Sequence, residues 1–499
     1  MMQSQYIPDN ITLNNNTLAQ LPIEVKRPMY NRCELKPGIV HIGVGNFHRA
    51  HQAWFLHRLM QRGLAQDWAI VGAGVRPFDE AQRQKLSAQD YLYSLVELST
   101  GSETAEVVGS LIDYLPIEPD NASLIKTMAD PSIRIVSLTV TEGGYYIDPA
   151  SNAFDGSHPD IVHDAANPQS PRTAFGAMLA ALRLRREQGL PPFTCMSCDN
   201  LQGNGVILKQ TLLSLAKISD PELASWLERE GSFPNSMVDC IVPATGPREL
   251  ELVKRFGLDD AVPVTHEPFR QWVIEDDFCA GRPDWDLVGA QFTDDVHDFE
   301  TMKIRLLNGG HQLLANAGEL LGVESIDGCI RHALIRGFFE CVEHREIAPH
   351  VRPVPGMTPT DYIALITERF ANPEIRDTTR RVAFDGSSRH AGFLLPTLRE
   401  AITSGGAVQG LLLAEALWAR MCAGTREDGS EIVANDPNWD QLLGVAIQAK
   451  SNPRAWLEQR EIYGDLADNP AVLETFDRWL NKLWQEGTEA TLQGWIGDD

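Results

Sequence analysis

Short apolar runs separated by helix-compatible segments mark the first half of the chain. Four of them read GIVHIGV at 38–44, WAIVGAGV at 68–75, IRIVSLTV at 133–140 and FTCMSC at 193–198. Each run has the length of a strand and is bounded by turn or helix signals. Strands that alternate with helices pair in parallel, so this pattern predicts an α/β sheet.

The pattern changes at about Asp298. From there on helical periods dominate, in FETMKIRLLNGGHQLLANAGELL, RHALIRGFFECVEHREI, TDYIALITERFA and AVQGLLLAEALWARMCAG. A chain of 499 residues is also too long for a single hydrophobic core. We therefore expect an α/β domain over residues 1–297 and a mostly α-helical domain over residues 298–499.

The composition is that of a globular protein, with 43% hydrophobic and 22% charged residues and no apolar run long enough to cross a membrane. The stretch MMQSQYIPDNITLNNNTL lacks a basic start and an apolar core, so we expect no secretory signal. The formal charge of −25 argues against nucleic acid and anionic membranes as partners. We expect a cytoplasmic protein that is a monomer or a weak oligomer.

Cysteine and histidine spacings give no metal site. Cys195 and Cys198 form a CxxC, but the surrounding PFTCMSCDN reads as a buried strand in which each thiol is a small apolar group rather than a redox centre. His48, His51 and His57 cluster without a Cys, Asp or Glu at metal-ligand spacing. We expect these histidines on a helix surface and in a cofactor loop.

A glycine turn follows the first strand and opens a helix, which is the context of a dinucleotide fingerprint. Gly43 permits the tight turn, Gly45 allows backbone N–H groups to approach a pyrophosphate, and Ala50 is small where helix and strand pack. Arg49 would add a positive charge. The usual third glycine is absent, and GxG is also common in ordinary turns. The residues expected at the cofactor are Ile42, Gly43, Val44, Gly45, Asn46, Phe47, His48, Arg49 and Ala50.

An acidic residue should follow the second strand and bind the ribose hydroxyls of the cofactor. The first candidate after WAIVGAGVRPF is Asp79. Asp79 lies further from the strand than the usual spacing, and its neighbour Phe78 is apolar. Asp79 is nevertheless the residue that we assign to the ribose.

The stretch KIRLLNGGH, at 303–311, places three polar side chains within one helical segment. With Asp298 as N-cap and 100° per residue, His311 lies about 80° and Asn308 about 140° around the helix from Lys303. The three side chains then share one arc. A polar row of this kind also occurs on the wet face of an ordinary helix.

Several blocks of the chain together resemble the polyol-specific long-chain dehydrogenases, the mannitol dehydrogenase family. The resemblance runs in order through GIVHIGVGNFHRAHQA, RIVSLTVTEGGYY, FTCMSCDNLQGNG, FPNSMVDCIVP, EPFRQWVIEDDF, GRPDWDLVGAQFTDDV, FETMKIRLLNGGH and FDGSS. It covers residues 38 to at least 390. It implies a Rossmann-type N-terminal domain, a helical C-terminal domain, an active site in the cleft between them, and zinc-independent, NAD(P)-linked oxidation of a secondary alcohol.

The resemblance also implies roles for individual residues. Lys303 matches the general base of the family, which must be a side chain when no metal is present. Asn308 and Asn200 match the two amides that donate to the reacting oxygen, and His311 matches a residue that binds the substrate. Glu300 resembles a carboxylate that relays the proton to solvent, although it also fits a plain helix N-terminal carboxylate.

On the substrate side the resemblance points to Asp239, Arg381 and Arg389. The chain departs from the family at neighbouring positions. Cys240 replaces an arginine, Arg389 stands where relatives often carry lysine and is followed by His390 instead of an apolar residue, and Gly310 replaces a common serine. These departures leave the expected base and amide donors unchanged but bear on which substrate fits.

We therefore predict an NAD-dependent polyol dehydrogenase without a metal, with NADP as the less favoured cofactor. The expected reaction converts a polyol to a ketose, mannitol to fructose and also arabinitol to xylulose. Two alternatives are a hexuronate reductase acting on fructuronate and mannonate, and a catalytically silent NAD-binding sensor. An intact Lys303, Asn308 and His311 argue against the sensor, since a sensor needs no base.

Overall fold

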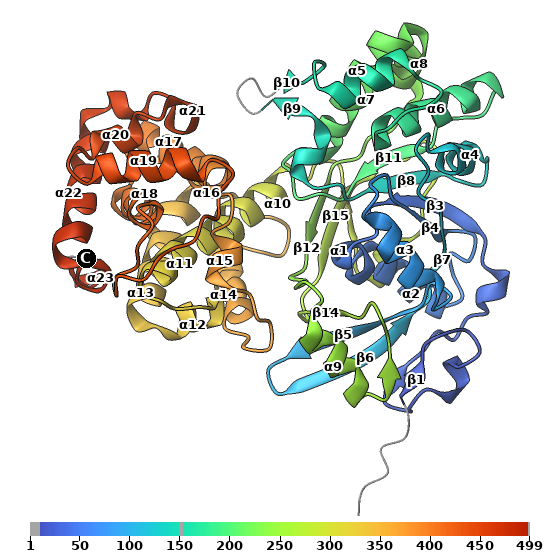
Figure 1. Ribbon diagram of the computed structural model, residues 1–499, viewed down its shortest axis with the longest axis horizontal. Helices are drawn as coiled ribbons and strands as arrows, with labels where there is room; N and C mark the ends of the chain where they lie inside the picture. Colours follow the sequence, from blue (N-terminus) through green and yellow to red (C-terminus); the bar gives the residue numbers. More distant parts are fainter. Residues whose placement is uncertain (1–9, 149–152, 498–499) are drawn as a thin grey trace, which may run out of the picture. The chain divides into compact units, whose positions relative to one another are not determined.

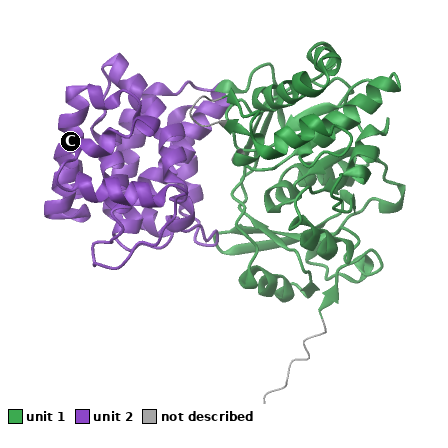
Figure 2. Cartoon of the chain, turned by 45° about the horizontal axis from the view of Figure 1, so that its top comes forward, with its two compact units in different colours: residues 1–297 green, residues 298–499 purple. Residues whose placement is uncertain are grey.

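The computed structural model describes residues 10–148 and 153–497 of the chain. Residues 1–9, the start of the stretch in which no secretory signal is expected, lie outside the described part. The chain divides into two compact units, residues 1–297 and 298–499, which are coloured separately in Figure 2. In the described part, the helices are all too short or too polar to cross a membrane.

A five-stranded parallel sheet forms the framework of the first unit (Figure 1). Its strands lie in the order β7, β4, β3, β8, β11, and each neighbouring pair is parallel. The strands are β3 Pro37–Ile42, β4 Ala69–Ala73, β7 Leu111–Tyr114, β8 Ile135–Leu138 and β11 Thr194–Ser197. The winding proceeds from β3 outward through β4 and β7, then restarts on the other side of β3 at β8. A doubly wound sheet binds its ligand at such a reversal.

The predicted α/β architecture is confirmed, and the four apolar runs correspond to β3, β4, β8 and β11. Both faces of the sheet are buried, since Val40 and Ile42 of β3 pack in one hydrophobic cluster and Ile39 packs in another. The first cluster is covered by α4 Ala122–Ala129, α6 Ala174–Glu187 and α7 Asn204–Ser219, and the second by α1 Asn46–Ala50 and α2 Gln52–Gln61. Burial on two faces explains why these strands read as continuous apolar runs.

The first unit also contains four smaller sheets and four further α-helices among its described residues. One small sheet has the order β14 Val264–His266, β5 Tyr93–Ser99, β6 Ser102–Val108 and β2 Val25–Lys26, and another has the order β12 Ser236–Asp239, β15 Gln271–Glu275 and β16 Gln291–Thr293. Two short pairs are β1 Ile11–Thr12 with β13 Leu258–Asp259, and β9 Ile147–Asp148 with β10 Ala153–Phe154. The other helices are α3 Asp79–Ser87, α5 Pro159–Ala166, α8 Pro221–Glu230 and α9 Pro247–Arg255.

Cys195 and Cys198 lie in and directly after β11, where both are buried and neither forms a disulfide. Burial raises the pKa of both thiols, so they remain protonated. Each therefore packs as a small apolar side chain, as the strand-like surroundings indicated.

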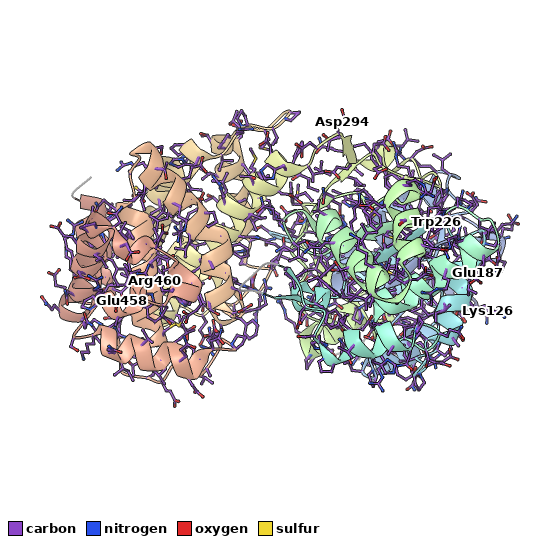
Figure 3. All side chains as sticks on the ribbon, turned by 90° about the horizontal axis from the view of Figure 1, so that it is seen from above. Lys126, Glu187, Trp226, Asp294, Glu458 and Arg460 are labelled. Atoms are coloured by element: carbon purple, nitrogen blue, oxygen red, sulfur yellow. The ribbon has the colours of Figure 1, made fainter. Side chains whose placement is uncertain are left out.

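The second unit is helical, as predicted. It contains α10 His297–Met302, α11 Gly309–Leu320, α12 Ile326–Arg331, α13 Ala333–Val342, α14 Pro359–Phe370, α15 Thr379–Val382, α16 Gly386–Arg389, α17 Leu395–Ser404, α18 Gln409–Cys422, α19 Trp439–Ala449, α20 Arg454–Leu457, α21 Arg460–Tyr463, α22 Pro470–Glu486 and α23 Thr488–Gly497. Helix α10 begins at the last residue of the first unit. Charged side chains such as Lys126 and Glu187 of the first unit, and Glu458 and Arg460 of the second, are exposed and labelled in Figure 3.

Three π-helical segments interrupt the helices of the second unit: Lys303–Asn308, Glu343–Ile347 and His390–Leu394. The first of them joins α10 to α11 and packs against the other two. The sequence-based assumption of 100° per residue is therefore wrong across residues 303–308. The assignment of Asp298 as N-cap is also wrong, because Asp298 lies within the first turn of α10.

A buried carboxyl group explains the glycine at position 310. A Cβ atom on Gly310 would lie 2.7 Å from Oε1 of Glu343 and 2.8 Å from Cε2 of Phe339. Glu343 is fully buried, and both of its oxygens lack a hydrogen-bond partner among the described residues. Burial raises the pKa of Glu343 well above its ordinary value, so this side chain is a neutral acid.

We expect Gly310→Ala to lower the free energy of unfolding by about 1–3 kcal/mol, the usual cost of overpacking a closed site. Thermal or urea unfolding of the purified variant measures this change. Gly444→Ala is the matched control, because Gly444 lies in α19 with no atom within 4 Å of its added Cβ, and alanine should there stabilise the helix. Equal stability of Gly310→Ala and wild type would show that the side chains of Glu343 and Phe339 move aside at no cost in free energy.

Candidate active site

The glycine turn lies at the point where the winding of the sheet reverses, directly after β3. Gly43 has a φ of +94°, and a Cβ atom there would lie 2.1 Å from the carbonyl oxygen of Thr139, which follows β8. The Thr139 hydroxyl donates to the Gly43 carbonyl at 2.6 Å. Only glycine satisfies both the conformation and this close approach.

Gly45 serves a different purpose. It is exposed, and the nearest atom to an added Cβ is the Gly43 carbonyl oxygen at 4.0 Å. A side chain at position 45 would fill the open space above the turn. Because glycine has no side chain, the backbone at the start of α1 stays accessible to a ligand. Asn46 fixes the turn by donating to the carbonyl of Pro243 at 3.0 Å and to the hydroxyl of Thr245 at 2.9 Å. This arrangement fits the pyrophosphate of a dinucleotide.

The other residues expected at the cofactor contribute through the backbone or from the rim. Ile42, Val44 and Ala50 are buried in the hydrophobic clusters on the two faces of the sheet. Phe47 is partly buried and stacks on His51 with 4.9 Å between ring centroids.

Arg49 points into the domain, so the expectation that it adds charge beside the phosphates is wrong. Its side chain is 2% exposed. The guanidinium donates to the carbonyl of Val262 and, at 2.7 Å, to Oδ1 of Asn46, and it lies over the Tyr93 ring. Arg49 therefore holds the glycine turn in place from behind.

The histidine cluster is buried, which corrects the expectation of a helix surface. His48, His51 and His57 are 2%, 0% and 0% exposed. His48 stacks on His41 with 3.4 Å between ring centroids, and burial lowers the pKa of His48 well below its ordinary value. The pair is therefore neutral and forms part of the packing beneath the turn.

Asp79 begins helix α3 and closes the turn that follows β4. Its Oδ2 accepts from the backbone N–H groups of Val75 at 3.1 Å and Arg76 at 3.0 Å. A Cβ atom on Gly74 would collide with the Asp79 carboxyl group at 2.5 Å. The carboxylate is therefore held at the carboxyl end of the second strand, although its position in sequence is later than usual.

Asn200 is exposed in the loop that follows β11, and its neighbour Asp199 fixes that loop. Asp199 accepts from the N–H groups of Val140 at 3.0 Å and Thr141 at 2.9 Å, and from the Tyr145 hydroxyl at 2.6 Å. These bonds join the loop after β11 to the loop after β8. Sequence analysis missed Asp199, although an acidic residue directly after a buried strand is a usable signal.

Asp239 is the last residue of β12 and is 4% exposed. Cys240, which stands where the family resemblance leads us to expect an arginine, is buried beside it and interacts electrostatically with Arg270. The Arg270 guanidinium is already engaged, since it donates to the Ala50 carbonyl at 2.7 Å and to the His266 ring at 2.8 Å. Arg270 therefore does not replace the missing arginine as a ligand group.

In the second unit the predicted catalytic row lies where α10, the first π-helical segment and α11 join. Glu300, Lys303 and Asn308 are 4%, 7% and 8% exposed. The i→i+5 bonding of a π-helix adds a residue to the turn, so Asn308, five residues after Lys303, lies more nearly above it than in an α-helix. The π segment thus brings the two side chains closer to one face of the helix.

Two polar atoms of this row are buried without a hydrogen-bond partner among the described residues: Nδ2 of Asn308 and Nε2 of His311. The His311 ring packs on Phe370 of α14 with 4.3 Å between centroids. Burial, together with nearby arginines, lowers the pKa of His311 to about 3, so the ring is neutral. Unsatisfied buried polar groups are costly, and a ligand hydroxyl is a natural partner for both.

Arg381 and Arg389 lie within electrostatic range of His311. Asp377, which sequence analysis missed, binds Arg381 through two parallel bonds, with Nε to Oδ1 at 2.6 Å. Arg389 donates to the carbonyl of Val382 at 2.6 Å. Much of the donor capacity of the two arginines is therefore used within the unit. The i, i+4 spacing of Asp377 and Arg381 is the sequence signal for this pair.

Comparisons with known proteins identify the family of the chain. The chain matches the Mannitol dehydrogenase Rossmann domain family over residues 37–287 and the Mannitol dehydrogenase C-terminal domain family over residues 295–484. It is 53% identical to a mannitol 2-dehydrogenase of Cereibacter sphaeroides, across 95% of this chain and 99% of that protein.

Two solved structures resemble the chain over nearly its whole length. One is a Pseudomonas fluorescens mannitol 2-dehydrogenase in a ternary complex with NAD and D-mannitol, with 41% identity, a TM-score of 0.91, and coverage of 98% of this chain and 100% of that one. The other is a D-sorbitol dehydrogenase in substrate-free form, with 35% identity, a TM-score of 0.87, and coverage of 97% and 100%. With both family profiles matched and such identity over most of its length, the chain belongs to the mannitol dehydrogenase family.

Proposed function

We propose that this protein oxidises a secondary alcohol of a polyol to a ketose with NAD as hydride acceptor, mannitol to fructose being the main reaction. The observation that carries the proposal is the row of buried Lys303, buried Asn308 and half-buried His311, in which two buried polar atoms lack a hydrogen-bond partner among the described residues. The similarity to mannitol 2-dehydrogenases, one of them solved with NAD and D-mannitol, supports the same reaction.

The first unit would hold the cofactor. The open backbone at Gly45 receives the pyrophosphate, and Oδ1 of Asp79 accepts from the ribose hydroxyls while Oδ2 keeps the turn closed. When bound, NAD supplies a carbon that takes the hydride from the alcohol. Asn200, in the loop after β11, lies at the carboxyl end of the sheet, which is where a doubly wound fold binds its ligands.

The second unit would supply the proton chemistry. Neutral Lys303 takes the hydroxyl proton as the hydride leaves, and the amides of Asn308 and Asn200 donate to the developing alkoxide. Neutral His311 hydrogen-bonds the substrate and keeps the reacting carbon oriented. Glu300, three residues before Lys303, passes the proton on toward solvent. Because the base and the donors are all side chains, this chemistry needs no metal ion.

Charge in the second unit favours a neutral polyol over a hexonate. A site for a carboxylate substrate should present a free bidentate cation. Arg381 is instead paired with Asp377, and Arg389 donates to a backbone carbonyl. In the first unit we assign Asp239, the last residue of β12, to the polyol hydroxyls, for which a carboxylate is an acceptor. Arabinitol, with the same kind of secondary alcohol, is the second substrate that we propose.

Lys303→Ala should lower kcat for mannitol oxidation by about 10²-fold or more, because general base catalysis typically contributes that much. NAD affinity, measured by fluorescence titration, should remain unchanged. The oxidation rate of the wild type should depend on an ionisation that disappears in the variant. Lys303→Arg is the matched control, since it keeps the positive charge but does not lose a proton at working pH. If Lys303→Ala retains more than about a tenth of wild-type turnover, Lys303 is not the base.

Asp79→Ala should raise kcat/KM with NADP relative to NAD, because the carboxylate repels a 2′-phosphate. The wild type should prefer NAD moderately, since Arg76 beside the site tolerates a phosphate. Asp79→Asn separates charge from turn geometry, because an amide oxygen can still accept from Val75 and Arg76. Both variants should shift the NADP/NAD ratio in the same direction. If the ratio of kcat/KM with NADP to kcat/KM with NAD is unchanged in both variants, another residue discriminates between the two cofactors.

The purified protein with NAD should oxidise mannitol or arabinitol with a higher kcat/KM than mannonate, and should reduce fructose in the reverse direction. Initial rates with each substrate under one set of conditions give the ranking. A tenfold preference for mannonate or fructuronate, about 1.4 kcal/mol in the transition state, would instead establish the hexuronate reaction. Absence of turnover with every polyol and hexonate would favour a sensor.

A further inference from the structure

A chain of hydrogen bonds crosses the core of the second unit through His390. Its members, in order, are Asn316, His390, Glu415, Tyr463 and Trp456. Asn316 Nδ2 lies 2.9 Å from His390 Nε2, and His390 Nδ1 lies 2.9 Å from Glu415 Oε1. Tyr463 Oη then lies 2.7 Å from Glu415 Oε2 and 2.7 Å from Trp456 Nε1.

The direction of each bond follows from what the groups can donate. The Trp456 indole only donates, so the Tyr463 hydroxyl accepts from it and donates to Glu415. The Glu415 carboxylate accepts, which places the proton of the His390 ring on Nδ1. The free lone pair of Nε2 then accepts from the Asn316 amide. His390 is thus held by one bond at each ring nitrogen.

This chain is fully buried. Asn316 is 1% exposed, His390 0% and Glu415 1%. The His390 ring also stacks on Trp418 with 4.3 Å between centroids and 15° between planes. Burial of a carboxylate with its partners brings little net stability compared with a well-packed apolar core.

The position of His390 connects it to the proposed substrate groups. It follows Arg389 directly and opens the π-helical segment His390–Leu394, which packs against the segment that carries Lys303 and Asn308. Its partner Asn316 lies on α11, the helix that carries His311. The Asn316–His390 bond therefore joins the backbone beside Arg389 to the helix beside His311.

We propose that His390 is a positioning residue for the polyol, which acts by holding the Arg389 segment at a fixed distance from helix α11. The proposal rests on the proposed function, in which His311 binds the substrate, and on the expectation from the family resemblance that Arg389 lies on the substrate side. The hydrogen bond to Asn316 fixes the Arg389 segment relative to helix α11. The hydrogen bond to Glu415 holds the His390 ring in the core. Loss of the Asn316 bond should then weaken substrate binding without changing the chemical step.

Two conservative substitutions separate the two bonds. The amide of His390→Gln coincides with Nε2 of the ring, so this variant keeps an acceptor for Asn316 and loses the bond to Glu415. The amide of His390→Asn coincides with Nδ1, so it keeps the bond to Glu415 and loses the bond to Asn316. Both should lower Tm. KM for mannitol should rise about tenfold in His390→Asn and stay within about twofold of wild type in His390→Gln, with kcat and KM for NAD nearly unchanged in both.

Tyr463→Phe is the matched control, because it removes the far end of the same chain. It should lower Tm and leave KM for mannitol unchanged. A rise of KM in Tyr463→Phe equal to that in His390→Asn, or no rise in His390→Asn, would show that the chain only stabilises the fold and would overturn the proposal. Turnover of mannitol by the wild type tests the proposed function. The role of His390 is tested separately, by the ratio of KM for mannitol in each variant to that in the wild type.

Discussion

The change from α- to π-helical bonding at Lys303–Asn308 is the constraint on which the candidate site depends. With uniform α-helical geometry, Lys303 and Asn308 would lie well apart around the helix. The i→i+5 segment brings Asn308 closer to the position above Lys303, while His311 follows at the start of α11. The proposed base and the proposed amide donor then lie closer to one face of the helix, as the removal of a proton from an alcohol requires.

This arrangement is costly for the fold. Asn308 and His311 each have one buried polar atom without a hydrogen-bond partner among the described residues. Both carboxyl oxygens of Glu343, behind Gly310, also lack a partner there. By contrast, the buried chain through His390 and Glu415 has a partner at each ring nitrogen and at both carboxylate oxygens, and leaves Oδ1 of Asn316 without one among the described residues. At the proposed site, a polar ligand would supply the bonds that Asn308 and His311 lack.

Much of this could be predicted from sequence because it depends on local pattern. The four apolar runs are strands, the glycine turn lies where the sheet reverses, and the polar row of Lys303, Asn308 and His311 lies on one helical stretch. Other features depend on contacts between distant residues. Arg49 and His48 look like surface groups beside a cofactor, but contacts with Val262 and His41 bury them. No periodicity in the sequence indicated the π segment.

The most direct measurement of the central claim is a crystal structure of the protein with NADH and mannitol, a combination that cannot react. We expect the Lys303 Nζ atom and the Asn308 amide to lie within hydrogen-bonding distance of the same secondary hydroxyl, with His311 on a neighbouring one. The carbon that bears that hydroxyl should face the nicotinamide ring of the cofactor. A polyol bound away from Lys303, or a hydroxyl at the nicotinamide that contacts a different base, would contradict this account of the site.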